Sequence, residues 1–266
     1  MPETLTSTDS SFVLREDQSG IAILTLNRPE KRNPLSEGML KQLTEILNDI
    51  NDDPAVRVVI LSHTGPSFSA GHDLKEVRAN QSSQYYNWLM NLCSNLMLSI
   101  IRLQKPVIAA VEGVATAAGC QLVASCDLAI AGENASFSTP GVNIGLFCST
   151  PMVALSRNVA TKHAMEMLLT GDPIDAKEAA RIGLINRAVA AGAASAEAYQ
   201  LALKIASKSA MTLRIGKEAF YRQQEMQLDV AYSFTSEVMT TNLMAEDAGE
   251  GIDAFIEKRS PQWKDR

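Results

Sequence analysis

In the sequence of 266 residues we expect no segment that directs the chain to or through a membrane. Its first ten residues contain two acidic groups and no Lys or Arg, unlike a secretory signal or a transit peptide. The least charged stretch, residues 113–126, is too short and too polar to span a bilayer. We therefore expect a soluble, cytoplasmic protein without a membrane span.

Cysteine and histidine are also scarce. Four cysteines occur, none in a CxxC pair, so we expect buried, reduced thiols in place of disulfides. The three histidines form no Cys/His cluster with the spacing of a structural zinc site, and we expect no metal. A chain of this length buries enough apolar surface to fold without a disulfide bond or a structural metal.

Positive charge is outnumbered, with 24 Lys and Arg against 30 Asp and Glu and a net charge of −6. Nucleic-acid binding requires a basic field, so this balance argues against nucleic acid as a partner. It leaves room for a local basic pocket that binds a small anion. Hydrophobic residues make up 46% and charged residues 20%, as in ordinary soluble globular proteins.

Signature motifs of four enzyme classes are missing. The sequence contains no GxGxxG, no GxxxxGK[ST], no HExxH and no GxSxG. These absences argue against a Rossmann dehydrogenase, a P-loop NTPase, a zinc protease and an α/β-hydrolase.

What the sequence does contain is an alternation of apolar strands and amphipathic helices. Short apolar runs predict buried strands at residues 21–26, 56–61, 107–111 and 127–131. Apolar residues at three- and four-residue steps predict helices over residues 39–50, capped by Ser36, and over residues 89–100. Strands that alternate with helices indicate parallel βα units and an α/β fold.

Three parts of the chain differ in pattern. Residues 1–11 are polar and predict a disordered tail. Residues 12–190 predict the α/β core, and residues 191–266 are almost purely helical. Because no Gly/Pro/Ser linker separates the last two parts, we expect the helical region to pack on the core or on a neighbouring subunit.

Two segments of small residues, 67–74 and 114–120, each follow a buried strand. Small side chains leave backbone N–H groups open to a ligand. If Ala117 or Ala118 opens a helix, its N–H also lies at the positive end of the helix dipole. Two such groups converging on one point would form an oxyanion hole. Close packing of helix on sheet also selects Ala and Gly, so both interpretations stay open on composition alone.

The order of several motifs resembles the crotonase, or enoyl-CoA hydratase/isomerase, family over residues 13–263. The similar segments are residues 26–35, 68–74, 105–113, 164–171 and 179–186. The resemblance implies an α/β spiral of ββα units in residues 12–190, with a helical trimerisation region in residues 191–266. It also implies trimers or hexamers that bind acyl-CoA thioesters, with coenzyme A as part of the substrate and no separate cofactor.

Within this family the shared chemistry is stabilisation of an enolate on the thioester oxygen. By position, the resemblance assigns the two N–H donors to Ala70 and Ala118. It assigns coenzyme A contacts to a set of residues in two loops and at the C-terminal end. The set is Lys31, Arg32, Ala70, Gly71, His72, Asp73, Leu74 and Lys258, the last reaching from the next subunit. Lys31 and Arg32 are equally explained as a solvated charged turn.

The sequence departs from the family at both positions where hydratases carry a glutamate. The first position is Gln121 and the second is Gly141. An amide has no useful basicity near neutral pH and glycine has no side chain, whereas general acid–base catalysis contributes about 10²–10⁴-fold. Segments 115–127 and 139–151 are similar to a vertebrate subgroup, the enoyl-CoA hydratase domain-containing proteins, that also lacks both glutamates.

A few polar groups remain as candidates near the thioester. His72 could titrate near physiological pH or only form hydrogen bonds. Cys148 and Ser149 could act as a nucleophile or an orienting hydroxyl, or simply line the pocket, which we favour. Asp73 is expected to fix its loop, Asn143 is a weaker candidate, and a triad of His72, Asp73 and Ser149 stays open.

The expected function is that of an acyl-CoA-binding crotonase-family protein, nominally an enoyl-CoA hydratase/isomerase in fatty-acid metabolism, with weak or no hydration of crotonyl-CoA. Three alternatives remain. One is a different enolate reaction, such as isomerisation, decarboxylation or thioester hydrolysis. The second is a non-enzymatic acyl-CoA binding or regulatory protein, and the third is a purely structural α/β scaffold.

Overall fold

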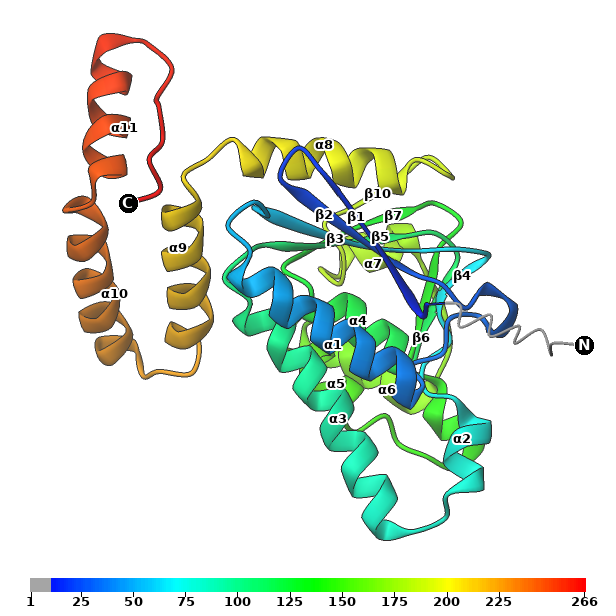
Figure 1. Cartoon of the computed structure of the whole chain (residues 1–266). Helices are drawn as coiled ribbons and strands as arrows, with labels where there is room; N and C mark the ends of the chain where they lie inside the picture. Colours follow the sequence, from blue (N-terminus) through cyan, green and yellow to red (C-terminus); the bar gives the residue numbers. More distant parts are fainter. Residues whose placement is uncertain (1–10) are drawn as a thin grey trace, which may run out of the picture.

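The computed structural model describes residues 11–266 (Figure 1), so the predicted tail at residues 1–11 lies almost wholly outside the described residues. The larger of two sheets has six strands in the order β1, β2, β3, β5, β7, β10. Their bounds are β1 Val13–Gln18, β2 Ile21–Leu26, β3 Val58–His63, β5 Val107–Val111, β7 Leu128–Gly132 and β10 Arg187–Val189. All neighbours pair in parallel except β1, which is antiparallel to β2.

A second, smaller sheet has the order β4, β6, β8, β9. Its strands are β4 Ser67–Ser69, β6 Val114–Thr116, β8 Ser136–Ser138 and β9 Ile174–Asp175. Three consecutive strand pairs, β3 with β4, β5 with β6 and β7 with β8, each place their first strand in the large sheet and their second in the small one. Helices follow each pair, which gives the predicted spiral of ββα units.

The helices occur between and after these pairs. In chain order they are η1 Pro29–Lys31, α1 Glu37–Asp52, α2 Leu74–Ala79, α3 Ser83–Arg102, α4 Ala118–Ser125, η2 Pro140–Ile144, α5 Pro151–Asn158, α6 Thr161–Thr170, α7 Ala176–Arg181, α8 Ala194–Ala206, α9 Ala210–Gln223, α10 Leu228–Leu243 and α11 Glu246–Glu257. Ser36 caps α1 by accepting a hydrogen bond from the N–H of Met39, as predicted.

The predicted strands all occur in the large sheet, with ends that shift by one or two residues. Strands β1 and β10 of the large sheet and the four short strands of the small sheet were not predicted from the sequence. In β1 only Val13 is buried, so no apolar alternation is visible. The short strands are at most three residues long, and three of the four include serine or threonine.

The large sheet is covered on both faces. In Figure 1, α8 lies above it, while α1, α3 and α4 lie below. The lower face buries the apolar stripe of α1, and each such side chain stabilises the fold by about 1.5–3 kcal/mol. The upper face contacts α8 through Ala194, Ala198 and Ala202, spaced four apart on one side of the helix.

Because α8 covers the sheet, it packs as part of the core although it belongs to the region 191–266. The last strand ends at Val189, and the described residues after it form only helices and connections. Helices α9, α10 and α11 stand to the left of the sheet in Figure 1. Trimerisation through this region stays a prediction.

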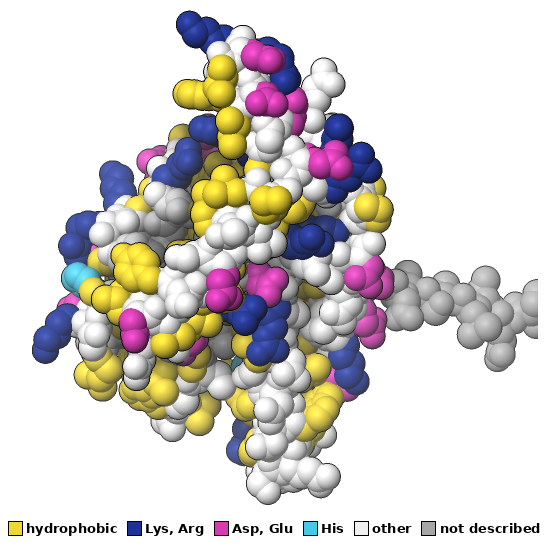
Figure 2. Space-filling view, turned by 90° about the vertical axis from the view of Figure 1, so that its left-hand side faces the viewer, with side chains coloured by type: hydrophobic (Ala, Val, Ile, Leu, Met, Phe, Trp, Pro, Cys, Tyr) yellow, Lys and Arg dark blue, Asp and Glu magenta, His cyan; other side chains and the backbone are white. Residues whose placement is uncertain are grey.

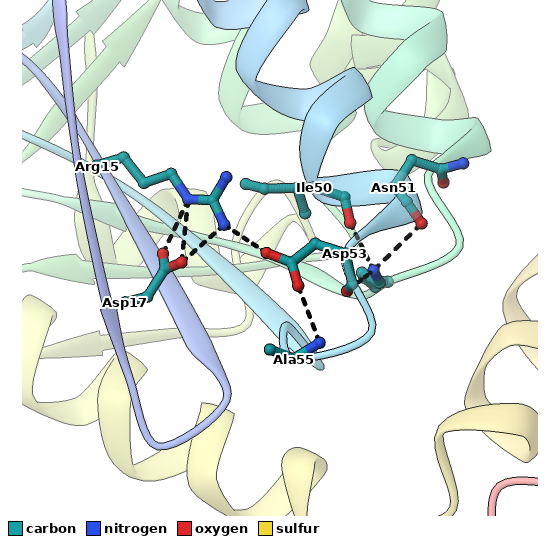
Figure 3. A network of polar contacts seen from close by, with 7 residues as sticks. Arg15, Asp17, Ile50, Asn51, Asp53 and Ala55 are labelled. Atoms are coloured by element: carbon teal, nitrogen blue, oxygen red, sulfur yellow. Dashed lines mark hydrogen bonds and ion pairs between the residues drawn. The ribbon is translucent and has the colours of Figure 1, made fainter.

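A network of polar contacts ties β1, α1 and the start of β5 together (Figure 3). The Lys105 ammonium donates to three carbonyl oxygens at the C-terminal end of α1, including those of Ile50 and Asn51. Arg15 from β1 pairs with Asp53 at 2.9 Å. A cation at this end of the helix satisfies carbonyls that have no partner within it.

Helix α9 is joined to the core by a buried ion pair. The Lys217 ammonium lies 2.6 Å from the Asp127 carboxylate, with side-chain exposures of 7% and 15%. It also donates to the carbonyl oxygens of Ile100 and Lys105, and Tyr221 donates its hydroxyl to Asp127. All three ammonium donors are therefore used, which offsets the cost of desolvating the charge.

His63, at the end of β3, is held as a neutral ring. Its Nε2 accepts the N–H of Glu112 at 3.0 Å, and its Nδ1 faces the carbonyl of Thr64. Burial lowers the pKa of His63, opposed by the contact with Thr64. Protonation of Nε2 would break the bond to Glu112.

Much of the outer surface of the C-terminal helices is apolar. Its exposed members are Phe220, Leu228, Val230, Tyr232, Met239, Leu243, Met244, Ile252, Phe255 and Ile256. Figure 2, in which the top is formed by α11, shows apolar side chains across this side of the molecule. Surfaces of this kind mark interaction sites.

The four cysteines are free and buried. None of the described helices has the length and apolar character needed to cross a bilayer.

We predict that Lys217→Met lowers the free energy of unfolding by about 3–5 kcal/mol, because it leaves the Asp127 carboxylate buried without a cation to pair with its charge. Urea denaturation measures the effect. The control is Lys41→Met, which breaks an exposed pair with Glu37 and should cost no more than about 0.5 kcal/mol. Equal losses in the two variants would contradict the role of the buried pair.

We predict that stability falls as the pH drops below about 6.5, the ordinary pKa of histidine. His63 and His72 both have pKa values lowered by burial, so the unfolded chain takes up protons that the folded chain does not. The slope should reach at most about 1.4 kcal/mol per pH unit for each histidine. Denaturation curves between about pH 8 and pH 5.5 test this, and a flat or rising stability on acidification would contradict it.

Candidate functional site

The turn between β2 and α1 is built around a buried asparagine. Asn33 is fully buried, with a φ of 48° that asparagine tolerates better than most residues. Its side chain accepts the N–H of Arg28 and donates to the carbonyl oxygens of Thr64 and Ser67. The turn is thereby fixed against the start of β4.

The same turn is joined to the segment that follows β4. The N–H of Ala70 donates to the carbonyl of Arg32 at 3.0 Å, and the N–H of Leu35 donates to the carbonyl of Gly71 at 2.8 Å. The Nδ1 of His72 lies 3.2 Å from the carbonyl of Leu35. Segments 31–35 and 70–72 therefore form one unit.

This unit lies directly against the start of α4. A Cβ placed on Gly71, whose φ is +83°, would come within 3.0 Å of the Ala117 Cβ and 3.2 Å of the Ala118 nitrogen. A Cβ on Gly119 would come within 2.4 Å of the carbonyl oxygen of Ser69. Only glycine permits such approach at both positions, so the two small-residue segments do meet.

Helix α4 begins at Ala118, one of the two starts expected from the sequence. The preceding residue, Ala117, has φ 51° and ψ −119°, a conformation that is costly for a residue with a Cβ. Its own N–H donates to the carbonyl of Ser138. Ala117 turns the chain into the helix, so the N–H of Ala118 lies at the positive, N-terminal end of the helix dipole.

The expected role of Ala70 as an N–H donor is wrong, because its N–H is already bonded to Arg32. The next amide, of Gly71, donates to the hydroxyl oxygen of Ser69. The following amide, of His72, has no acceptor among residues 11–266, and neither has that of Ala118. The geometry therefore moves the first free donor from Ala70 to His72.

The His72 ring is fixed by its backbone contact. A carbonyl only accepts, so Nδ1 carries the proton and Nε2 has a lone pair. Nε2 is buried and has no partner among the described residues. Burial lowers the pKa of His72, opposed by the bond to Leu35, so the ring is neutral at physiological pH.

The two positions at which the family resemblance implies a missing glutamate both lie inside the protein. Gln121, 4% exposed, stands one turn after Ala118 on α4, and its Oε1 is buried without a partner in the described residues. A Cβ on Gly141 would come within 2.6 Å of the Leu146 carbonyl oxygen and 2.9 Å of the Cys148 sulfur. The second position therefore has no space for a side chain.

The candidate triad is not formed. Asp73 instead caps α2, accepting the N–H groups of Lys75 and Glu76, which agrees with the expected loop-fixing role. Ser149 is exposed and donates to the carbonyl of Phe147. His72 contacts a backbone carbonyl where the triad would require a carboxylate.

Cys148 is buried and the pKa of its thiol is raised by burial, which opposes a role as nucleophile and agrees with pocket lining. Asn143, the weaker polar candidate, is exposed. Among the described residues, no three His, Cys, Asp or Glu side chains gather as a metal site would require.

The expected coenzyme A contacts fall into two groups. Lys31 and Arg32 are exposed and adjoin the 70–72 segment, next to Leu74, which is 51% exposed. Lys258 ends α11, which Figure 1 places on the opposite side of the molecule from α2. Any contact of Lys258 with this site therefore requires a second chain, and its role stays a prediction.

Comparison with known proteins gives consistent matches. A family model described as enoyl-CoA hydratase/isomerase matches residues 16–266. The rat enoyl-CoA hydratase domain-containing protein 3, mitochondrial, is 49% identical over 247 residues, covering 92% of this chain and 82% of its own. This is the subgroup that the motifs resemble.

Solved structures agree. The crystal structure of human enoyl Coenzyme A hydratase domain-containing protein 3 has a TM-score of 0.92 at 47% identity, covering 95% of this chain and 100% of its own. An enoyl-CoA hydratase from Mycobacterium smegmatis has a TM-score of 0.93 at 49% identity, covering 95% and 98%.

The expectation of a cytoplasmic location is wrong by the same comparison. The rat, mouse and human relatives are all named as mitochondrial. The expectation rested on the residue types of the first ten positions, which are a weak indicator of compartment.

Three findings agree with one another: the family match over residues 16–266, the spiral of ββα units shared with solved structures, and the meeting of the two small-residue segments. The chain therefore belongs to the crotonase, or enoyl-CoA hydratase/isomerase, family.

Proposed function

We propose that this protein binds acyl-CoA thioesters and holds the thioester oxygen between the N–H groups of His72 and Ala118. The supporting observation is the approach of Gly71 to Ala117 and Ala118, which brings the following amide of His72 close to the start of α4. Both amides lack an acceptor within the described residues. A ligand oxygen would supply one.

Such a pair stabilises negative charge that develops on the oxygen, as in a thioester enolate. The segment around Ala118 is almost fully buried, so little water screens the interaction. The dipole of α4 acts in the same direction. One donor of this kind contributes about 2.7–4 kcal/mol to a transition state.

The proposed site has few groups that could transfer a proton. Gln121 and Gly141 supply no acid or base, and His72 Nε2 is the lone titratable atom that we assign to the site. We therefore propose that the protein forms an enolate more readily than it adds water to an enoyl thioester. Reactions that need one base or none, such as isomerisation, decarboxylation or thioester hydrolysis, suit these residues better.

The absence of both glutamates also favours a second candidate, a protein that binds or senses acyl-CoA without turnover. Calorimetry and CoA-release assays over a panel of thioesters distinguish the two. Saturable binding with no product would favour the second candidate, and neither binding nor turnover would contradict both.

We further propose that the apolar face of α9, α10 and α11 joins copies of the chain into trimers or hexamers. The supporting observation is the row of exposed apolar side chains on these helices, which includes Phe255 and Ile256. In such an assembly Lys258 of one chain can approach the coenzyme A bound to another. No separate cofactor is required by this proposal.

We predict that Gly71→Ala weakens acyl-CoA binding by about tenfold or more, because a Cβ there pushes Ala117 and Ala118 away. The matched control is Gly192→Ala, which has the same left-handed backbone, φ +80°, with nothing within 4 Å of the added atom. Calorimetry with butyryl-CoA measures both. Equal binding by the two variants would contradict the proposed convergence.

We predict weak or undetectable hydration of crotonyl-CoA, and a gain of about 10²-fold or more from Gln121→Glu, which restores one acid at nearly constant volume. Gly141→Glu should give no gain, because the Leu146 carbonyl and the Cys148 sulfur fill the space. The change in absorbance of the enoyl thioester measures the rate. Ordinary turnover by the unaltered protein, on the order of 10 per second, would show that the missing glutamates are not needed.

A further inference from the structure

A pocket lies away from the proposed thioester site, where the C-terminal end of α3 meets α9. Its volume is about 320 Å³. Six polar or aromatic residues line it, together with Ile101 and Leu103 at its apolar wall. They are Arg102, Gln104, Arg214, Glu218, Tyr221 and Arg222. Three guanidinium groups around one pocket are unusual in a chain with a net charge of −6.

The charges of this pocket, which we call the arginine pocket, are not balanced from within. Arg222 faces Glu218 at 3.3 Å and also lies over the ring of Phe234. Neither Arg102 nor Arg214 forms an ion pair with any residue in the described range 11–266. The pocket therefore holds two more positive than negative charges.

Helix ends explain only part of this arrangement. Arg102 and Arg222 stand in the last turns of α3 and α9, where a cation complements the helix dipole. Arg214 stands in the second turn of α9, where the dipole of that helix gives a cation no stabilisation. Its placement beside two other guanidinium groups is a cost that a bound anion would remove.

We propose that the arginine pocket binds a phosphate group, as found on a phosphate monoester with an apolar or planar body. A phosphate monoester carries a charge close to −2 near pH 7, which matches the excess positive charge. Guanidinium groups bind phosphate oxygens through paired N–H donors. Ile101, Leu103 and the ring of Tyr221 offer an apolar wall for the rest of the molecule.

The pocket adjoins the buried contact that holds α9 on the core. Tyr221 lines the pocket and donates its hydroxyl to Asp127, the partner of Lys217. A ligand between α3 and α9 would bridge the two helices at this junction. Occupation of the pocket should therefore raise the thermal stability of the protein.

The test uses inorganic phosphate and AMP at low ionic strength, with acetate as a monoanion control. Calorimetry and thermal unfolding should show saturable binding of AMP, tighter than that of phosphate, and none of acetate. Added salt should weaken binding, because the arginines are exposed. The double variant Arg102→Gln/Arg214→Gln should weaken AMP binding by about tenfold or more.

The matched control removes two positive charges at the turn proposed for coenzyme A, in Lys31→Gln/Arg32→Gln. Binding that survives in this variant and is lost in the arginine-pocket variant supports the proposal. Loss in the control variant alone would assign the phosphate to the coenzyme A turn and overturn it. Equal weakening in both variants, or no saturable binding of AMP or phosphate, would also overturn it.

Discussion

The site depends on one close approach, between the backbone after β4 and the backbone that opens α4. Gly71 and Gly119 permit it, since a Cβ at either position would meet atoms of the facing segment at 3.2 Å or less. Ala117 accepts an unfavourable backbone conformation at the same place. The turn around Asn33 holds one side of the contact, and the strand pairs β3–β4 and β5–β6 deliver the two segments to it. The spiral of ββα units is thus the means by which two backbone segments that are distant in the sequence come together.

Much of this could be predicted from the sequence, because strands β2, β3, β5 and β7 are apolar runs and helices α1 and α3 carry strong apolar periodicity. The meeting of the two small-residue segments was one of two interpretations that the residues left open, and the family resemblance implied it. The identity of the first donor was not, because a sequence does not show that the amide of Ala70 is used by Arg32. The short strands of the second sheet were missed for a similar reason, since their burial comes from the fold around them and not from apolar alternation.

The surroundings of Gln121 and Gly141 bear on the two glutamates that the family resemblance implies are missing. The Leu146 carbonyl and the Cys148 thiol fill the space beside Gly141. A glutamate side chain at this position would therefore have no space. Gln121 and the Nε2 of His72 are instead left as buried polar atoms without partners in the described part of the chain. Atoms of this kind cost about 1–3 kcal/mol each and are most often found where a ligand or water is bound. The buried pair of Lys217 and Asp127 fixes α9 at the far side of the core, from which the apolar C-terminal helices extend.

The most direct measurement is a crystal structure of the protein with butyryl-CoA. It should place the thioester oxygen at about 2.7–3.1 Å from the backbone nitrogens of both His72 and Ala118, the range of a formed oxyanion hole. The amide of Ala70 should keep its bond to Arg32 in the complex. A thioester oxygen held by other groups, or an acyl group bound away from the meeting point of Gly71 and Ala118, would contradict the account.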